Sequence, residues 1–159
     1  MKTREQVVGL VVIVVIVAAA PALGAWTTAE ATRTWYQEIN RPAWTPPNWL
    51  FGPVWTTLYA LMALSAWLVW REKGFAARRG PLTLFIVQLA LNAAWTPLFF
   101  GMRWFGVAFV EIVVMWAAIV ATTVAFFRVH TAAGWLLVPY LVWVSYASTL
   151  SGGIWWLNR

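Results

Sequence analysis

Five long apolar runs, joined by short polar connectors, constrain the fold of this chain more than any other feature. A helix needs about 20 apolar residues to cross the hydrocarbon core of a bilayer, and each run is about that long. The runs cover residues 7–26, 47–70, 82–100, 104–127 and 134–156. They predict an all-α integral membrane protein, in which residues 1–159 form one domain built as a bundle of five transmembrane helices.

The composition supports a membrane location. Hydrophobic residues make up 62% of the chain and charged residues 10%, whereas about a quarter of the residues in a soluble globular protein are charged. The net charge of +6 would also suit a nucleic-acid-binding protein, but the basic residues flank the apolar runs. We therefore expect the partner of this charge to be the lipid bilayer and not a nucleic acid.

The N-terminal run has a second interpretation. Lys2 and Arg4, the apolar core of residues 7–17 and the small residues "AAAPALGA" (18–25) resemble a cleavable signal peptide. Because the run continues to Trp26 and is long enough to span a bilayer, we interpret it as the first transmembrane helix.

Lysine and arginine residues are unevenly divided between the two ends of the predicted bundle. With five spans, the side of the N-terminus holds seven and the other side holds four. The first group is Lys2, Arg4, Arg71, Lys73, Arg78, Arg79 and Arg128, and the second is Arg33, Arg41, Arg103 and Arg159. If the protein lies in an inner membrane, this bias predicts a cytoplasmic N-terminus and an outside C-terminus.

The connector of residues 27–46 is the only long one, and we expect it to form an ordered lid loop on the outer side. Its apolar residues are too many for a disordered linker; they are Trp35, Tyr36, Ile39 and Trp44. A short helix inside the loop would begin with Thr27 or Thr28 as its N-cap. Thr45 would cap the second transmembrane helix, with Pro46 at the first helical position.

Three residues inside the predicted spans lie at a similar depth below the outer rim. At a rise of 1.5 Å per residue, Trp55 and Asn92 lie about 12 Å deep and Glu111 lies about 10 Å deep. Polar residues in a span usually face the bundle interior, where they serve as hydrogen bonds between helices or as part of a ligand cavity. The shared depth favours a cavity.

Further residues can be placed around the same cavity. Trp95 shares a helix face with Asn92, and Tyr140, Trp143 and Ala147 share a face of the fifth helix. For Trp44, an interfacial aromatic belt is the alternative to a place in the cavity. Prolines in three spans each free a carbonyl that needs a partner, which also favours a cavity; they are Pro53, Pro97 and Pro139.

No metal site is predicted. The chain has no cysteine, so a thiolate site is excluded. The single histidine, His130, lies between two spans, where we interpret it as a solvated loop residue; ligation of a haem iron is the alternative, but no second ligand lies near it.

The sequence resembles the TspO/MBR family, that of the tryptophan-rich sensory proteins and translocator proteins, also called peripheral benzodiazepine receptors. The resemblance rests on "WYQEINRPAWTPPNWLFGPVWTTLY" (35–59), "LNAAWTPLFFG" (91–101) and "WLLVPYLVWVSYASTL" (135–150). It covers nearly the whole chain, although the first helix matches only in being apolar. It implies a five-helix bundle, usually a homodimer, that binds protoporphyrin IX, haem and synthetic isoquinoline or benzodiazepine-type ligands under the first loop.

By motif match, the resemblance also implies roles for individual residues. Trp55 and Trp143 correspond to pocket tryptophans tied to light-dependent porphyrin breakdown, and they would be catalytic only if that photochemistry occurs. The other matches are a loop residue over the ligand (Tyr36), a polar pocket residue (Asn92), a small residue beside the helix-5 tryptophan (Ala147) and a position that is acidic in many members (Glu111).

The sequence departs from the animal members at the end of the fifth helix. Those members carry a cholesterol-associated stretch with a tyrosine, and the corresponding "TLSGGIWWLNR" (149–159) has none. Sterol recognition is therefore not expected there, and the member is expected to be of bacterial type. Ala90 and Ala94 form a small-xxx-small pair that suits a dimer seam on the third helix.

Three functions remain open at this stage, in the following order. The first is a receptor that binds and senses tetrapyrroles, with protoporphyrin IX or haem as ligand and no required cofactor. The second is an enzyme-like, photo-oxidative breakdown of protoporphyrin IX through the pocket tryptophans. The third is transport of tetrapyrroles or other lipophiles, which this chain would not drive by ATP hydrolysis because it has no nucleotide-binding loop. The propionates of a porphyrin would need a cation at the rim, for which Arg41 and Arg33 are the candidates.

Overall fold

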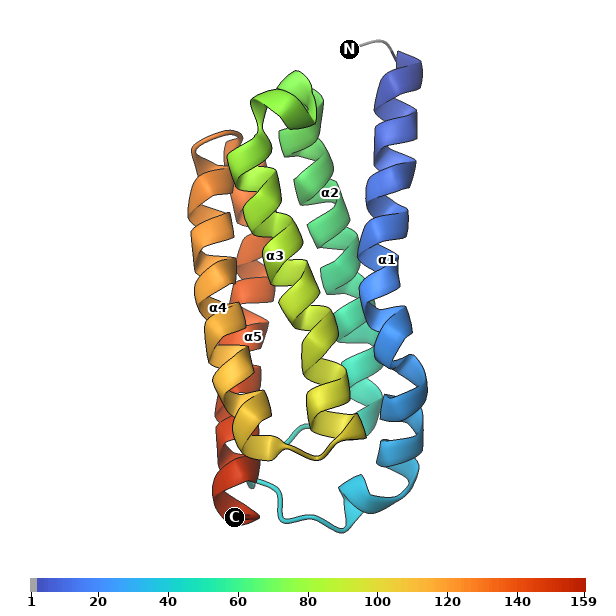
Figure 1. Ribbon diagram of the computed structural model, residues 1–159, viewed down its shortest axis with the longest axis vertical. Helices are drawn as coiled ribbons and strands as arrows, with labels where there is room; N and C mark the ends of the chain where they lie inside the picture. The colour runs from blue at the N-terminus through green and yellow to red at the C-terminus, as the bar shows by residue number, and fades with distance from the viewer. Residues whose placement is uncertain (1–2) are drawn as a thin grey trace.

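The computed structural model describes residues 3–159 as a bundle of five long helices (Figure 1). The helices are α1 (Thr3–Arg33), α2 (Phe51–Ala77), α3 (Arg79–Thr96), α4 (Phe105–Phe127) and α5 (Thr131–Leu157). Each is long and apolar enough to cross a bilayer once α3 is taken with the π-helical turn η3 (Pro97–Gly101) that extends it. The predicted fold class is confirmed. Lys2, which contributed to the orientation count, lies outside the described residues.

The five helices close into a ring in the order α1, α2, α5, α4, α3, with each helix packed on its two neighbours. Figure 1 shows the N-terminus and the C-terminus at opposite ends of the bundle. The α1–α2 and α3–α4 connections lie at the C-terminal end, which we call the lid end, and the other two connections lie at the N-terminal end. Buried apolar side chains from all five helices fill the centre, among them Val17, Met62, Phe85, Met115 and Tyr140.

Helix α1 is longer than the predicted span. It continues past Trp26 to Arg33, so the predicted separate loop helix is wrong, as is its cap at Thr27 or Thr28. Both hydroxyls donate instead to the carbonyl of Gly24, at 2.9 Å. A threonine hydroxyl can either cap a new helix or bond back to the preceding turn of an existing one, and here the second arrangement continues the helix.

The predicted start of the second span also differs. The Thr45 hydroxyl does not cap that helix but donates to the carbonyl of Pro42 at 2.7 Å, which closes a turn within the loop. The chain then enters α2 through the 3₁₀ turn η2 (Asn48–Leu50), which has Pro47 at its N-cap position and no side-chain cap. A second 3₁₀ turn, η1 (Trp35–Gln37), follows α1 directly. The connector between α1 and η2 is therefore ordered but shorter than residues 27–46.

The α3–α4 connection contains the π-helical turn. Pro97 begins η3, and its carbonyl accepts a bond from the backbone N–H of Met102 at 2.9 Å. Proline cannot donate to the preceding turn of α3, so the regular helix ends here. The wider turn places two successive aromatic residues, Phe99 and Phe100, beside the loop, and such π turns are frequent at functional sites.

Candidate functional site

A cavity of about 440 Å³ lies inside the ring near the lid end and is lined by residues of all five helices. This volume falls within the range of about 300–1,000 Å³ that is typical of ligand pockets. None of the described residues on its wall is charged. Its aromatic lining consists of Tyr36, Phe51, Trp55, Tyr59, Trp95, Phe99, Phe100 and Trp143.

Six of the nine predicted site residues line this cavity. They come from the loop, α2, α3 and α5, and are Tyr36, Trp55, Asn92, Trp95, Trp143 and Ala147. The prediction that Trp55 and Asn92 line the same cavity is therefore confirmed. The three predicted residues that are not among the described lining residues are Trp44, Glu111 and Tyr140.

Glu111 lies next to a cavity-lining residue of α4 but does not itself line the cavity. The cavity-facing residues of α4 are Ile112 and Met115, and one residue along a helix turns the side chain by about 100°. Both carboxylate oxygens of Glu111 are enclosed, with no hydrogen-bond partner among the described residues. Trp44 lies outside the cavity and is 54% exposed, as expected for the interfacial alternative.

Tyr140 lies about one helical turn before Trp143 in α5. It belongs to a hydrogen-bond network behind the cavity wall. The Tyr59 hydroxyl donates to Asn92 Oδ1 at 2.6 Å, and Asn92 Nδ2 donates to the Tyr140 hydroxyl at 3.2 Å. The Tyr140 hydroxyl in turn donates to Gln88 Oε1 at 2.9 Å. Asn92 therefore serves both alternatives weighed from the sequence, since it lines the cavity and also bonds α2, α3 and α5 together.

The three cavity tryptophans differ in how their indole groups are held. Trp95 donates its indole N–H to the carbonyl of Ala108 at 3.1 Å and stacks on Phe99 with 4.8 Å between ring centroids. Trp55 stacks on Tyr59 at 5.5 Å, and Trp143 meets Phe51 edge to face at 5.9 Å. Within the described chain, no protein acceptor is found for the indole N–H of Trp55 or Trp143, so both donors remain available to a ligand.

The loop is fastened over the cavity from the C-terminal end of α5. Asn158 accepts from the backbone N–H of Asn40 at 3.1 Å and donates to its carbonyl at 2.8 Å. The Tyr146 hydroxyl donates to the carbonyl of Trp44. Pro42 packs directly on Gly153, where an added Cβ would lie only 2.5 Å from the proline Cγ. The loop thus forms a lid that contacts α5 and the residue after it at three positions, Tyr146, Gly153 and Asn158.

Tyr36 is the lid residue that faces the cavity. Its ring packs on Phe99 and Phe100, with centroids 6.3 and 5.5 Å away. The guanidinium of Arg41 lies 5.4 Å from the ring centroid, and Arg41 is exposed and is not itself a lining residue. Burial raises the pKa of the Tyr36 hydroxyl, and the positive charge of Arg41 opposes that rise. The rim of an otherwise uncharged cavity therefore carries a cation.

Several lining residues of α1 were missed from the sequence. The wall contributed by α1 begins at Pro21, the one proline that lines the cavity; Pro53, Pro97 and Pro139 do not. After Pro21, small residues recur at a spacing of four, and this pattern could have identified the cavity-facing side of α1. The residues are Gly24, Thr28 and Thr32 in one series and Ala25 and Ala29 in the other. Such residues let a helix approach closely, and Gly24 lies against Thr96 of α3.

Two other predicted features lie away from the cavity. His130 sits in the α4–α5 connection at the N-terminal end, far from the lid, and is partly buried with an enclosed Nδ1 that has no partner among the described residues. His130 is therefore a loop residue as expected, although it is only partly exposed, and a haem in the cavity would not reach this imidazole. Ala90 and Ala94 are both exposed on the outer face of α3.

Comparisons with known proteins agree with this architecture. The model of the TspO/MBR family matches residues 11–157. The chain is 42% identical to the human translocator protein over 142 residues, which are 86% of this chain and 84% of that protein. It is 44% identical to a tryptophan-rich sensory protein of Cereibacter sphaeroides over 74% of this chain and 72% of that protein. It is 40% identical to a tryptophan-rich protein TspO of Chlorobaculum tepidum over 98% of this chain and 99% of that protein.

Proposed function

The chain belongs to the TspO/MBR family, and we propose that it is a membrane receptor that binds tetrapyrroles such as protoporphyrin IX or haem in the cavity under the lid. The receptor would report or limit the level of the bound tetrapyrrole. One observation carries the proposal: Trp55 of α2 and Trp143 of α5 line one uncharged cavity that a fastened lid covers.

The chemistry of the cavity suits a flat aromatic macrocycle. Indole and phenol rings attract an aromatic ligand through stacked and edge-to-face contacts, and eight aromatic residues line this wall. The two uncommitted indole N–H groups would donate to polar atoms of the ligand. The propionates would meet Arg41 at the rim, because a carboxylate needs a cation or donors where it leaves the apolar interior. Synthetic isoquinoline or benzodiazepine-type ligands would use the same rings.

A titration with protoporphyrin IX in the dark tests this proposal. Purified protein in detergent is titrated while the porphyrin absorption band is followed, since the 14 tryptophans of the chain would blur a protein fluorescence signal. We expect saturable binding that is weakened in Trp55→Phe and Trp143→Phe. Trp104→Phe is the matched control, because Trp104 is 55% exposed and lies outside the cavity. Equal binding by all four proteins would overturn the proposal.

Light-dependent breakdown of the porphyrin is the second candidate function. It is favoured by the contact of Trp55 with two phenols, at 5.5 Å from the ring of Tyr59 and 6.2 Å from that of Tyr140. Illuminating the same titrated samples separates the two functions. Loss of the porphyrin band in light that requires both Trp55 and Trp143 would make the cavity photochemical, whereas an intact porphyrin would leave a receptor. Transport ranks third, because no feature of the cavity specifically favours it.

We also propose that the protein is a homodimer with a seam on α3. The exposed pair Ala90 and Ala94 would let two copies of this helix approach closely. Because the chain contains no cysteine, Ala90→Cys introduces a single thiol. Oxidation in membranes should give a disulfide-linked dimer for this variant but not for Ala117→Cys on the exposed side of α4. Failure of Ala90→Cys and Ala94→Cys to cross-link would contradict this seam.

The proposed orientation places the N-terminus in the cytoplasm and the lid outside. Among the described residues, the N-terminal end carries six lysine or arginine residues and the lid end four. Membrane-impermeant thiol labelling of Arg159→Cys in intact cells would support this orientation, and labelling of Arg128→Cys instead would reverse it.

A further inference from the structure

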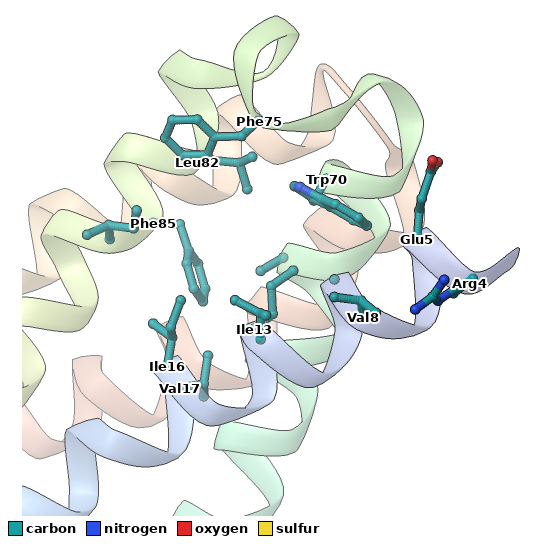
Figure 2. Close-up of a pocket in the computed structure, with 14 residues that line it drawn as sticks. Arg4, Glu5, Val8, Ile13, Ile16, Val17, Trp70, Phe75, Leu82 and Phe85 are labelled. Carbon is teal, nitrogen blue, oxygen red and sulfur yellow. The ribbon is translucent and has the colours of Figure 1, made fainter. Parts of the chain in front are cut away.

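A second, larger apolar groove lies at the opposite end of the bundle from the lid. It has a volume of about 860 Å³ and runs between the N-terminal half of α1 and the facing parts of α2 and α3. It shares no lining residue with the ligand cavity. Figure 2 shows Trp70, Phe75, Leu82 and Phe85 on one side of this groove and the side chains of α1 on the other.

The walls of the groove are exposed and its floor is buried. Val17, Leu82 and Phe85 are at most 5% exposed, whereas Val12 on α1 and Ile86 on α3 are 49% and 46% exposed. Helix α1 is also the helix least covered by the bundle. Of the residues in its apolar 18-residue segment, 17% are buried, compared with 33% in the corresponding segment of each other helix. An apolar groove that opens sideways along a transmembrane helix faces the lipid, so its occupant comes from the bilayer.

The length of the groove matches one leaflet. Along α1 it extends from Arg4 to Val17, which is about 20 Å at 1.5 Å per residue. Half of the hydrocarbon core of a bilayer is about 15 Å thick. The groove is therefore long enough for an acyl chain that spans one leaflet, with a few ångströms left at its mouth. A transmembrane helix of a partner protein would need a seam across the full hydrocarbon core, about 30 Å, which is longer than this groove.

The mouth of the groove carries charged residues. Figure 2 shows Arg4 and Glu5 together at the N-terminal end of α1, with Arg4 beside Val8. Around this end, the described residues include six basic side chains and only two acidic ones, Glu5 and Glu72. The basic residues are Arg4, Arg71, Lys73, Arg78, Arg79 and Arg128. Charge at this end therefore complements an anionic head group and disfavours a cationic one.

The C-terminal end of α2 keeps an apolar residue at the mouth of the groove. Gly74 has φ of 75°, a conformation that L-residues rarely adopt, and the helical path is interrupted there. The next residue, Phe75, turns to line the groove although it is 45% exposed. Basic residues flank this phenylalanine in the segment "REKGFAARR" (71–79). Basic residues beside the end of a transmembrane helix are typical of a segment that lies at the level of anionic lipid head groups.

We propose that this groove is a binding site for one anionic phospholipid, which places an acyl chain between α1 and α3 and its head-group phosphate beside Arg4. The lipid completes the packing of α1 against the bundle, because it covers the exposed apolar walls of the groove, which include Val12 and Ile86. Arg4 can donate hydrogen bonds to the phosphate in a planar, forked geometry.

The test uses native mass spectrometry of the full-length protein in mild detergent, incubated with equal amounts of dioleoyl phosphatidylglycerol and dioleoyl phosphatidylcholine and without porphyrin. We expect wild type to retain one phosphatidylglycerol in preference to phosphatidylcholine. Arg4→Gln should lower that retention roughly fivefold, as expected for one basic residue beside an anionic lipid. Arg128→Gln removes a charge at the same end outside the groove and should have the smaller effect.

Filling the groove tests its role separately from charge. Val12→Trp should lower phosphatidylglycerol retention at least as far as Arg4→Gln, whereas Val11→Trp should not, because Val11 is similarly exposed but lies outside the groove. Ile86→Trp, with Val87→Trp as its control, repeats the comparison from α3. Equal retention of both lipids by wild type would overturn the anionic site. Equal retention by the groove-filling variants and their controls would overturn the groove as its location.

Discussion

Asn158, next to last in the chain, forms two hydrogen bonds with the backbone of Asn40 in the lid, accepting at 3.1 Å and donating at 2.8 Å. The two residues lie 118 positions apart in the sequence. The backbone of the lid is therefore paired with one amide side chain, much as one strand pairs with another. Opening the lid for a ligand must break this pair.

Asn158→Ala should make the lid open more readily. The variant loses the two hydrogen bonds to the lid, worth together about 1 kcal/mol at an exposed site, so bound porphyrin should dissociate roughly fivefold faster. It also loses a bond from Asn158 Nδ2 to the carbonyl of Ile154, which lies within α5 and does not hold the lid. Stopped-flow release of porphyrin into excess apomyoglobin measures this rate. Asn40→Ala is the matched control, because the pair uses the Asn40 backbone and its side chain adds only a long bond of 3.4 Å to the carbonyl of Leu157. Equal acceleration by both variants would contradict the role of the pair.

Gly153→Ala should displace the lid from α5. The added methyl group would lie 2.5 Å from the Cγ of Pro42, and a proline ring cannot turn aside. We expect faster amide hydrogen exchange over residues 35–45 in this variant. Gly80→Ala has open space around its Cβ and should leave the lid unchanged, although alanine in a helix stabilises by up to about 1 kcal/mol. Unchanged exchange in Gly153→Ala would show that Pro42 does not hold the lid there.

Asn92→Leu should destabilise the bundle itself. Its buried amide accepts from Tyr59 and donates to Tyr140, and leaving a buried polar group without a partner costs about 1–3 kcal/mol. Tyr59→Phe removes one hydroxyl together with its single bond and should cost about 1 kcal/mol. Thermal unfolding in detergent measures both. Because both variants break the same bond, the double variant should be less destabilised than the sum of the two; simple additivity would contradict the network.

Arg41→Gln should weaken binding of a porphyrin with free propionates. An exposed ion pair contributes at most about 1 kcal/mol, so the dissociation constant of protoporphyrin IX should rise by up to roughly fivefold. The dimethyl ester of the same porphyrin has no carboxylate and should bind both proteins equally. Arg33→Gln separates the two cations considered from the sequence, because Arg33 has no contact with a lining ring among those described, whereas Arg41 lies over Tyr36. A larger effect of Arg33→Gln would move the carboxylate site.

The helical bundle was predictable because membrane spans carry a strong local signal. Apolar runs of about 20 residues predicted the positions of all five helices, and counting residues from the rim correctly predicted that Trp55 and Asn92 line one cavity. Counting residues does not predict which way a side chain points around the helix axis. Glu111 was therefore placed in the cavity, although its neighbour Ile112 is the residue that lines it. The side on which a helix meets its neighbours depends on packing and cannot be counted along the chain.

The lid was predictable only in outline. Its apolar residues indicated order, but the hydroxyls of Thr27 and Thr45 were assigned as caps and instead bond to Gly24 and Pro42. The ties to Asn158, Tyr146 and Gly153 join residues that are far apart in sequence, so no local pattern records them. For the same reason Tyr140, on the expected face of its helix, was placed in the cavity although its hydroxyl bonds behind the wall.

The most direct test of the central claim fills the cavity from its own wall. Ala147 lines it beside Trp143, and a phenylalanine there would occupy space that a ligand needs. In a dark titration, Ala147→Phe should weaken protoporphyrin IX binding by roughly tenfold or more, since overfilling a packed site costs about 1–3 kcal/mol. Ala132→Phe, at an exposed position of the same helix, should bind like wild type. Wild-type affinity in Ala147→Phe would place the porphyrin somewhere other than beneath this lid.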